Sequence, residues 1–427
     1  MSDLDLGLSF LLNQSAASVM VIFWCTLFLE VPRYGFPFIA MAIAGLAKPA
    51  KLSATGCLFQ VPKGVSVSVI VVGHNEAASL ESCVRSLCEQ SFNNFEIVIV
   101  SDGSSDGMRR IATRLVRDGL AARVIATDLR GGKSSALNLA ISACRSDIVI
   151  NVDCDCSYDR FAIEQILKIF EDPSVGGACG DIRARNGDAS LVARFQEIEY
   201  LLTITVGKLI GNVFNQVTCL SGAFSAFRRE ALAVVGSFQV GSGEDLDLTL
   251  RLRASGWRVA YVPTAICYTD VPVSVAALLR QRRRWERDSV RLRYRKHRDL
   301  MLPTRGRFHL AEAVHQWEFL LFGVVGAIAF PLYLAGLFAL YDDMAITILV
   351  AIQLGLLVVD TAMLVLAEAI TREPVFIRNA TYMIGFSLFT SYVMRFVRLW
   401  AYFEEWLLFA SVRDDYVPHK VRVIRKW

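Results

Sequence analysis

The stretch Ile148-Val149-Ile150-Asn151-Val152-Asp153-Cys154-Asp155 decides the fold. It is a short β-branched apolar run, typical of a buried strand, and it ends directly in two carboxylates. Three similar runs precede it, and stretches of helical length and periodicity separate the four. The strand-like runs are Val65–Val72, Phe95–Val100 and Arg123–Thr127, and the helical stretches are Ala77–Glu89, Ser105–Asp118 and Ser134–Cys144. This alternation predicts an α/β domain with a largely parallel sheet that helices cover on both faces.

Polar or glycine-rich sequence follows each predicted strand, at the edge where ligands bind in such sheets. Asp153 and Asp155 leave their strand one residue apart, so both carboxylates can converge on Mg²⁺ or Mn²⁺ together with substrate phosphates. An isolated Asp-x-Asp is more often a solvated turn, but the strand before it and the motifs below favour a metal site. Asn75, Glu76 and Asp102 follow the first two strands and either contact a nucleobase or ribose, or cap the next helices.

A glycine-rich loop, Gly131-Gly132-Lys133-Ser134-Ser135, opens the helix after the third strand. Its glycines allow close backbone approach, the start of a helix favours anions, and Lys133 can reach a phosphate. The segment lacks the spacing of a P-loop, so its alternative role is an ordinary helix cap.

Glu244 and Asp245 follow Gly241-Ser242-Gly243 and precede four leucines at alternate positions. The alternation indicates a strand, whereas the acids at the start and Gly256 at the end indicate a helix, which we favour. In either case a carboxylate lies at the start of an element, where it can act as a general base or as a cap.

The segment Gln281-Arg282-Arg283-Arg284-Trp285 lies in a strongly basic stretch, with ten Lys and Arg against two acids between Arg280 and Arg298. Leu278, Trp285 and Leu292 recur every seven residues, which predicts one apolar stripe on a cationic helix suited to a lipid surface. In addition, an arginine can neutralise a diphosphate, and an indole can stack on a sugar ring.

The composition indicates a membrane protein. Hydrophobic residues make up 54% of the 427, above the ~45–50% of ordinary globular chains, and they crowd residues 6–47 and 319–411. This excludes a disordered chain, a fibrous repeat and a disulfide-stapled module. The net charge of +4 is too small to indicate nucleic acid, and the ten cysteines show no zinc spacing.

Several segments are long and apolar enough to cross a ~30 Å hydrocarbon core. Leu6–Leu29 and Phe319–Tyr341 carry no charge, and Met344–Ala367, interrupted by Asp360, and Asn379–Met394 are further candidates. Tyr34–Ala47 is predicted to be interfacial or re-entrant, and Leu399–Val412, with two glutamates, is either a span or an interfacial helix. Asp360 is either a functional intramembrane carboxyl or one paired within the bundle. Basic flanks predict a cytosolic soluble domain and tail, so four crossings, or two plus interfacial helices, must separate them.

In this order, the motifs resemble those of the processive members of glycosyltransferase family 2, such as bacterial cellulose synthase, hyaluronan synthase and chitin-oligosaccharide synthase. The resemblance covers roughly residues 60–300 and implies a GT-A fold, a UDP-sugar donor and Mg²⁺ or Mn²⁺. It implies uridine contacts at Asn75, Glu76 and Asp102, a contact near the nucleotide at Lys133, and a metal and diphosphate site at Asp153 and Asp155. It further implies an acceptor-side loop at Ser221-Gly222-Ala223-Phe224, a base at Asp245 beside Glu244, and the QxxRW signature of polymerising members at Gln281, Arg284 and Trp285.

Two features depart from the family pattern. The family motif is Thr-Glu-Asp or Gly-Asp-Asp, and the sequence here is Gly-Glu-Asp rather than Thr-Glu-Asp, although both acids persist. Residues 416–420 resemble the gating loop of cellulose synthase only loosely.

From the resemblance we predict a membrane-embedded inverting glycosyltransferase that extends a polysaccharide processively and exports it, with its catalytic domain on the cytoplasmic side of the inner membrane. The predicted regions are an N-terminal membrane segment at 1–50, the GT-A domain at 60–300, membrane or interfacial helices at 301–412 and a basic tail at 413–427. The expected partners are the UDP-sugar, a glycan acceptor and the bilayer, and no nucleic acid. The alternatives are transfer of one sugar to a polyprenyl phosphate or other lipid, and a transporter or structural membrane protein with a nucleotide-binding domain.

Overall fold

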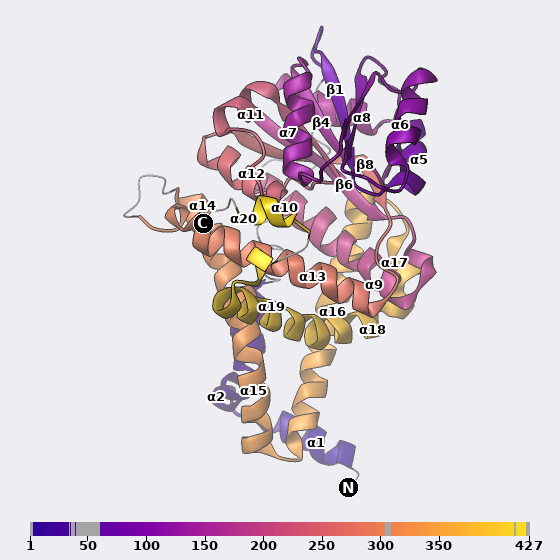
Figure 1. The fold of residues 1–427 in the computed structure, drawn as a ribbon. Helices are drawn as coiled ribbons and strands as arrows, with labels where there is room; N and C mark the ends of the chain where they lie inside the picture. The colour runs from indigo at the N-terminus through magenta and orange to yellow at the C-terminus, as the bar shows by residue number, and fades with distance from the viewer. Residues whose placement is uncertain are drawn as a thin grey trace.

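An eight-stranded sheet forms the centre of the α/β domain (Figure 1), in a computed structural model that describes residues 3–33, 35, 39, 60–303, 309–413 and 416–423. The strand order is β3-β2-β1-β4-β7-β6-β8-β5. The strands are β1 (Val67–Gly73), β2 (Glu96–Asp102), β3 (Arg123–Thr127), β4 (Ile148–Asp153), β5 (Ser157–Tyr158), β6 (Val175–Ala184), β7 (Phe224–Arg228) and β8 (Arg258–Thr269).

The four strands predicted from the sequence form one parallel half of this sheet, in the order β3-β2-β1-β4. The other half is mixed, because β7 runs antiparallel to both β4 and β6, whereas β6 and β8 are parallel. The predicted α/β fold with a mostly parallel sheet is therefore confirmed.

Helices cover both faces of the sheet, as the alternation of elements predicts. On one face α5 (Ala77–Cys88), α6 (Met108–Arg117) and α8 (Ala162–Lys168) enclose a core, and on the other α7 (Lys133–Ala143), α11 (Arg229–Val235) and α12 (Glu244–Ala254) enclose a second. The segment that begins at Glu244 is thus the favoured helix and not a strand. Its leucines alternate because Leu248 and Leu252 face the sheet while Leu246 and Leu250 belong to a separate cluster.

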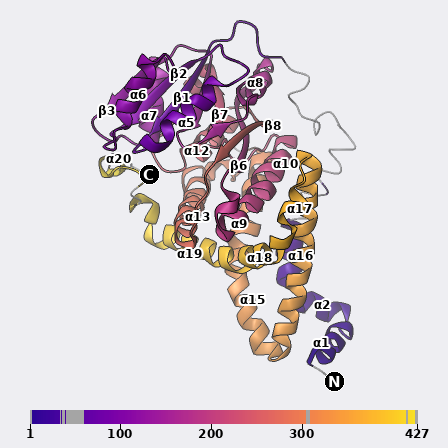
Figure 2. The ribbon, with the colours of Figure 1, turned by 90° about the vertical axis from the view of Figure 1, so that its right-hand side faces the viewer.

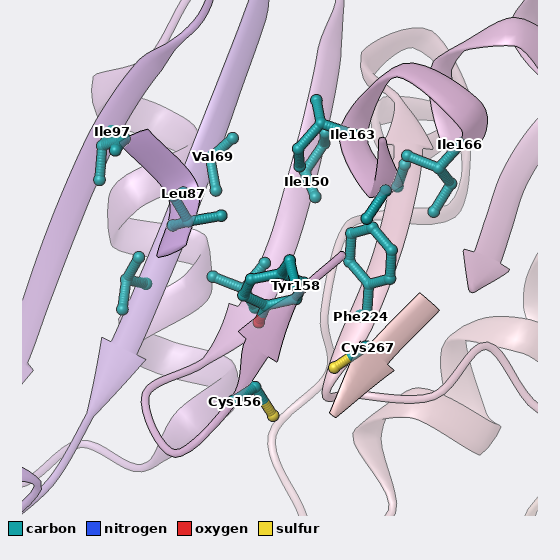
Figure 3. Close-up of a cluster of buried hydrophobic side chains, with 14 of the residues drawn as sticks. Val69, Leu87, Ile97, Ile150, Cys156, Tyr158, Ile163, Ile166, Phe224 and Cys267 are labelled. Atoms are coloured by element: carbon teal, nitrogen blue, oxygen red, sulfur yellow. The ribbon is translucent and has the colours of Figure 1, made fainter. Parts of the chain in front are cut away.

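The first of these cores fixes the strand ends that carry the polar motifs (Figure 3). Val69 and Ile150, on neighbouring strands, are fully buried together with Leu87 of α5. The rings of Tyr158 and Phe224 lie 5.1 Å apart, and the Tyr158 hydroxyl donates to the carbonyl of Ala223. The loop before β7 is therefore anchored to the core.

Two helices are long and apolar enough to cross a membrane among the described residues. The first is a continuous run, Leu310–Tyr341, that contains α14 (Leu310–Glu318), η7 (Phe319–Val325) and α15 (Gly326–Tyr341), and the second is α16 (Met344–Thr371). They descend together from the α/β domain (Figures 1 and 2). These helices match two of the predicted spans.

The N-terminal segment is not the single straight crossing that its 24 uncharged residues suggested. It folds as α1 (Asp3–Leu12) and α2 (Ala16–Ile22), bent by 116°, which is either a broken span or a re-entrant loop. The polar residues at the bend explain it, because the Asn13 amide bonds back to the carbonyl of Ser9 and the Ser15 hydroxyl caps α2. The segment 34–47, predicted to be interfacial or re-entrant, lies outside the described residues apart from Gly35 and Ile39.

The last helices do not add spans within the part of the chain that the structure describes. The predicted crossing at 379–394 covers the end of α17 (Val375–Asn379), η8 (Ala380–Tyr382) and the first part of a continuous helical run made of α18 (Met383–Leu388), η9 (Phe389–Val393) and α19 (Met394–Leu408). Arg395 and Arg398 interrupt the apolar sequence of that run. Figures 1 and 2 show α19 lying crosswise to α15 near the upper end of that helix, while α18 lies beside α16. Trp400 on one face of α19 is 54% exposed, whereas Glu405 on the other is fully buried. Of the two alternatives for 399–412, the structure favours the interfacial helix.

The acids in α19 are buried because they meet the basic segment predicted from the sequence. Glu404 binds Arg283 of α13 (Val275–Val290), and Glu405 binds Arg295 of η5 (Arg291–Lys296) at 2.8 Å. The cationic helix therefore lies between the sheet domain and α19.

Candidate active site

The carboxyl ends of β1, β2 and β4 meet at one edge of the sheet, and the predicted site residues lie around that edge. Both carboxylate oxygens of Asp102 accept backbone N–H groups, from Gly131 and from Gly132, each at 2.7 Å. Asp102 is only 3% exposed, so it braces the glycine loop that precedes α7. Its contact with a nucleobase stays a prediction.

Asn75 and Glu76 have local structural roles at the same edge. Asn75 adopts a positive φ of 60°, and its side-chain oxygen accepts the N–H of Ser105 at 2.8 Å. Glu76 precedes α5, and the cap of that helix comes instead from Asp106, whose carboxylate accepts the N–H of Ala77. Burial raises the pKa of Glu76, and Asp155 and Asp153 add to the shift.

Lys133 is the cation at the centre of the site. Its ammonium lies 2.6 Å from an oxygen of Asp153, 3.6 Å from an oxygen of Glu244 and 3.4 Å from the carbonyl of Gly222. Burial works to lower the pKa of Lys133, but the two carboxylates outweigh it and the net shift is upward. Lys133 is therefore a positive charge held between two carboxylates.

Glu244 and Asp245 form the first turn of α12, and the two carboxyls differ in their surroundings. Asp245 is half-buried and accepts backbone N–H groups, from Leu246 at 2.8 Å and from Gly222 at 3.3 Å. Glu244 is 6% exposed, and burial raises its pKa to about 7, although Lys133 opposes the shift. Two neighbouring carboxyls whose surroundings differ in this way typically have different roles in a reaction.

Gly222 is the point where these groups converge. A Cβ atom at this position would lie 2.8 Å from the Lys133 ammonium, 3.6 Å from Glu244 and 3.7 Å from Asp245. The Gly222 carbonyl also accepts from the Asn151 amide at 2.7 Å, which ties the loop to β4. The structure thus brings together residues 133, 153, 222, 244 and 245, which are separated by up to 112 positions.

The residues available for a divalent metal are Asp153 and Asp155. Within the described residues, no three or more His, Cys, Asp or Glu side chains form a complete ligand set. Asp153 pairs with Lys133, whereas Asp155 has no ion pair in that part of the chain. Burial raises the pKa of Asp153, and Lys133 offsets part of that shift. Two carboxylates of this kind fit an ion that takes its other ligands from a diphosphate and water.

The C-terminal segment Tyr416–Val423 reaches the same place. The guanidinium of Arg284 lies 4.0 Å from the centre of the Tyr416 ring, and Arg130 donates to the Tyr416 carbonyl at 3.0 Å. Pro418 would lie 3.3 Å from a Cβ at Gly132. Arg284 is therefore linked through the tail to the loop that bears Lys133.

Gln281 and Trp285 lie beside the site, next to η4 (Tyr200–Val206). Arg282 connects the two, because it donates to Gln281 at 2.8 Å and lies 4.3 Å from the centre of the Trp285 ring. Arg282 also lies 5.9 Å from the centre of the Tyr200 ring, and Tyr200 is in a cluster against which Ala223 packs. Trp285 thus reaches the Gly222 loop through intermediate residues.

The stripe predicted from positions 278, 285 and 292 does not form. Leu278 and Leu292 are buried, but Trp285 is 40% exposed. Leu278 and Trp285 lie two turns apart on the same face of α13 but differ in burial, and Leu292 lies beyond the end of that α-helix at Val290, in the π-helix η5.

Two residues near the site were not assigned a role from the sequence. Lys208, 5% exposed, donates to the Ser221 hydroxyl next to Gly222, and Tyr416 contacts Arg284. Lys208 lies in an apolar helical stretch, and only the fold shows what it meets.

Comparison with known proteins identifies the class of protein that has this fold and site. The model of the glycosyltransferase-like family 2 matches residues 62–287, and the chain belongs to that family. The family predicted from the sequence motifs, and with it the glycosyltransferase class, is confirmed.

Individual relatives agree with that membership. The chain is 31% identical over 246 residues to an N-acetylglucosaminyltransferase of Azorhizobium caulinodans, an alignment that covers 54% of this chain and 61% of the relative. It is 29% identical over 221 residues to a poly-β-1,6-N-acetyl-D-glucosamine synthase of Staphylococcus aureus strain COL, covering 51% and 53%. The matched parts are thus under two thirds of the length of these curated relatives.

A solved structure shares the fold. The mannosyltransferase PcManGT from Pyrobaculum calidifontis, in complex with GDP-Man and Mn²⁺, aligns with a TM-score of 0.59 and 20% identity. The alignment covers 87% of this chain and 99% of that one. At 20% identity this likeness shows a shared GT-A fold and nothing about the substrate.

Proposed function

We propose that this chain is a membrane-embedded inverting glycosyltransferase that moves a sugar from a UDP-sugar onto a growing polysaccharide. The observation that carries the proposal is the convergence of Lys133, Asp153, Glu244 and Asp245 around the Gly222 loop. It places a cation suited to a phosphate next to a carboxylate suited to an acceptor hydroxyl.

In the proposed reaction, an acceptor hydroxyl attacks the anomeric carbon as the bond to the diphosphate oxygen breaks. Asp245 takes the hydroxyl proton, and its bonds from the N–H groups of Gly222 and Leu246 hold it in place. Lys133 and Arg284 neutralise charge on the leaving nucleoside diphosphate. Glu244 holds the Lys133 ammonium, and Trp285 supports the acceptor sugar.

A divalent cation, Mg²⁺ or Mn²⁺, would be held by Asp155 and Asp153. When bound, it supplies positive charge to the departing diphosphate.

The base is tested by Asp245→Asn in purified, lipid-reconstituted protein. We expect sugar transfer to fall at least about 100-fold, because the amide cannot take the proton, while UDP binding stays within about twofold. Asp118→Asn, an exposed acid at the end of α6, is the matched control and should transfer sugar normally. Normal turnover in Asp245→Asn would reject the assignment.

The donor is tested by measuring nucleoside diphosphate release from UDP-N-acetylglucosamine, UDP-glucose and GDP-mannose with Mg²⁺ or Mn²⁺. We expect release from a UDP-sugar, with N-acetylglucosamine and glucose as the first candidates. The names of the relatives, an N-acetylglucosaminyltransferase and a poly-N-acetylglucosamine synthase, support N-acetylglucosamine. Release from GDP-mannose alone would overturn the UDP part of the proposal.

The acceptor class is tested by extracting labelled product with organic solvent. Relatives named as polymer synthases support a glycan product, which stays in the aqueous phase. A product that partitions into solvent would indicate transfer of one sugar to a polyprenyl phosphate or other lipid instead. Processive synthesis with export, which is part of the proposal, predicts long chains inside sealed inverted vesicles.

A further inference from the structure

Buried polar contacts hold the loop just before Asp245, and none of them involves a group to which chemistry has been assigned. The hydroxyl of Ser242 donates to one carboxylate oxygen of Asp288, and Arg291 donates to the other at 3.0 Å. Arg291 also donates to the Ser242 carbonyl at 2.5 Å. All three residues are 5% exposed or less, so water does not compete for these bonds.

Gly243 shows how closely this loop approaches the basic helix. Its φ of 69° is in the left-handed region, and a Cβ would lie 3.1 Å from the Asp288 Cβ and 3.0 Å from Leu292. A threonine at this position would meet both strain and steric conflict. Glycine at position 243, rather than the threonine of the Thr-Glu-Asp form of the motif, therefore allows the neighbouring basic helix to pack directly against the loop.

The same segment also holds α12 on the other side of Asp245. Asp247, 2% exposed, accepts from Lys296 at 2.5 Å and from His297 at 2.8 Å. Residues 288–297 thus contact the chain on both sides of Asp245, at Ser242 and at Asp247.

We propose that Asp288–His297 is a positioning segment that sets Asp245 relative to Arg284 and Trp285, which α13 carries just before it. Ser242, Asp247 and Asp288 are positioning residues, because Ser242 and Asp288 act on Asp245 through the loop before α12 and Asp247 acts through the first turn of α12. The inference rests on the proposed function. Its physical basis is that misplacing a reacting group by about 1 Å can cost about 100-fold in rate.

The test is Ser242→Ala, which removes one hydroxyl and leaves the Asp288–Arg291 ion pair. We expect kcat to fall about 3- to 10-fold, with the donor KM and UDP affinity within about twofold, and Ser242→Thr to recover most of the loss. Asp288→Asn, which also weakens the pair with Arg291, should lower kcat about 10- to 100-fold. The matched control is Ser66→Ala, since Ser66 donates to Asp147 at 2.7 Å at the opposite end of the sheet.

Wild-type kcat in Ser242→Ala would overturn the inference, and so would an equal loss of kcat in Ser66→Ala, which would indicate a general loss of stability. If Asp288→Asn does not fold, Ser242→Ala decides alone. The inference and the proposed function fail separately. An active Asp245→Asn rejects the function, whereas an inactive Asp245→Asn beside a normal Ser242→Ala rejects only the positioning segment.

Discussion

At the scale of single residues, the neighbours Glu244 and Asp245 are distinguished by what they face. Glu244 is buried against Lys133, so its ionised form is stabilised by one ammonium and opposed by loss of water. Asp245 accepts two backbone N–H groups at the start of a helix, from Gly222 and Leu246. This difference supports Asp245 as the base and Glu244 as the residue that holds Lys133.

The raised pKa of Glu244 predicts a pH dependence of stability. The native carboxyl keeps its proton up to pH about 7, whereas the unfolded one loses it near 4.5, so its contribution is present below pH 4.5 and is lost as pH rises through 7. Glu244→Gln lacks this loss. We therefore expect the melting temperature of Glu244→Gln, relative to that of the wild type, to be roughly 2–4 °C higher at pH 8 than at pH 5. The melting temperatures are measured by fluorescence in detergent. If the melting temperatures of the two proteins change with pH in the same way, the raised pKa of Glu244 is contradicted.

At the scale of elements, the C-terminal tail is an unexpected part of the site. Tyr416 lies on Arg284, and nearby Glu244 and Lys133 influence its hydroxyl. Loss of hydration raises the pKa of that hydroxyl to about 12, and Glu244 adds to the shift. The tail thus contacts both the arginine of α13 and the loop before α7, which the sequence separates by about 150 residues.

Removal of the Tyr416 ring tests this contact. In Tyr416→Ala the Arg284 side chain loses its aromatic partner, a contact worth about 0.5–2 kcal/mol, so we expect the donor KM to rise about 2- to 10-fold with a smaller change in kcat. Tyr416→Phe keeps the ring and is the matched control. Equal effects in both variants would assign the role to the hydroxyl.

At the scale of the whole molecule, the sheet domain and the long helices share one core. Leu364 and Ala367 of α16 pack against Phe195 and Leu201 of the segment α9 (Leu191–Glu199) and η4. Ion pairs reinforce this packing, since Glu373 binds Arg183, Arg378 binds Glu197, and Glu312 binds Arg253 at 3.0 Å. The α/β domain that carries the site is therefore packed against the long apolar helices.

If α15 and α16 cross the membrane and the catalytic domain is cytoplasmic, as the basic flanks predict, the turn between these helices lies on the opposite side. Asp343 lies in this turn and is exposed, and Cys88 of the α/β domain is an exposed native thiol. In intact cells, a membrane-impermeant maleimide should label Asp343→Cys and leave Cys88 unlabelled, and permeabilisation should expose Cys88. Labelling of Cys88 in intact wild-type cells would contradict a cytoplasmic catalytic domain.

The sequence by itself determined the parallel half of the sheet, the helices between its strands, two long apolar helices and the family. These follow from periodicity and from motifs at strand ends, which are local properties of the chain. It also indicated the residues that meet at Gly222, because the carboxyl ends of parallel strands share one edge of a sheet.

Only the tertiary structure decided which partners each side chain meets. It showed that Asp102 braces the glycine loop, that Trp285 stays exposed beside Arg282, that α19 lies crosswise to α15, and that Asp288 holds the loop before Asp245. None of these has a periodic signal, because each depends on a contact between elements, and a contact energy depends on distance in space and not on spacing along the chain.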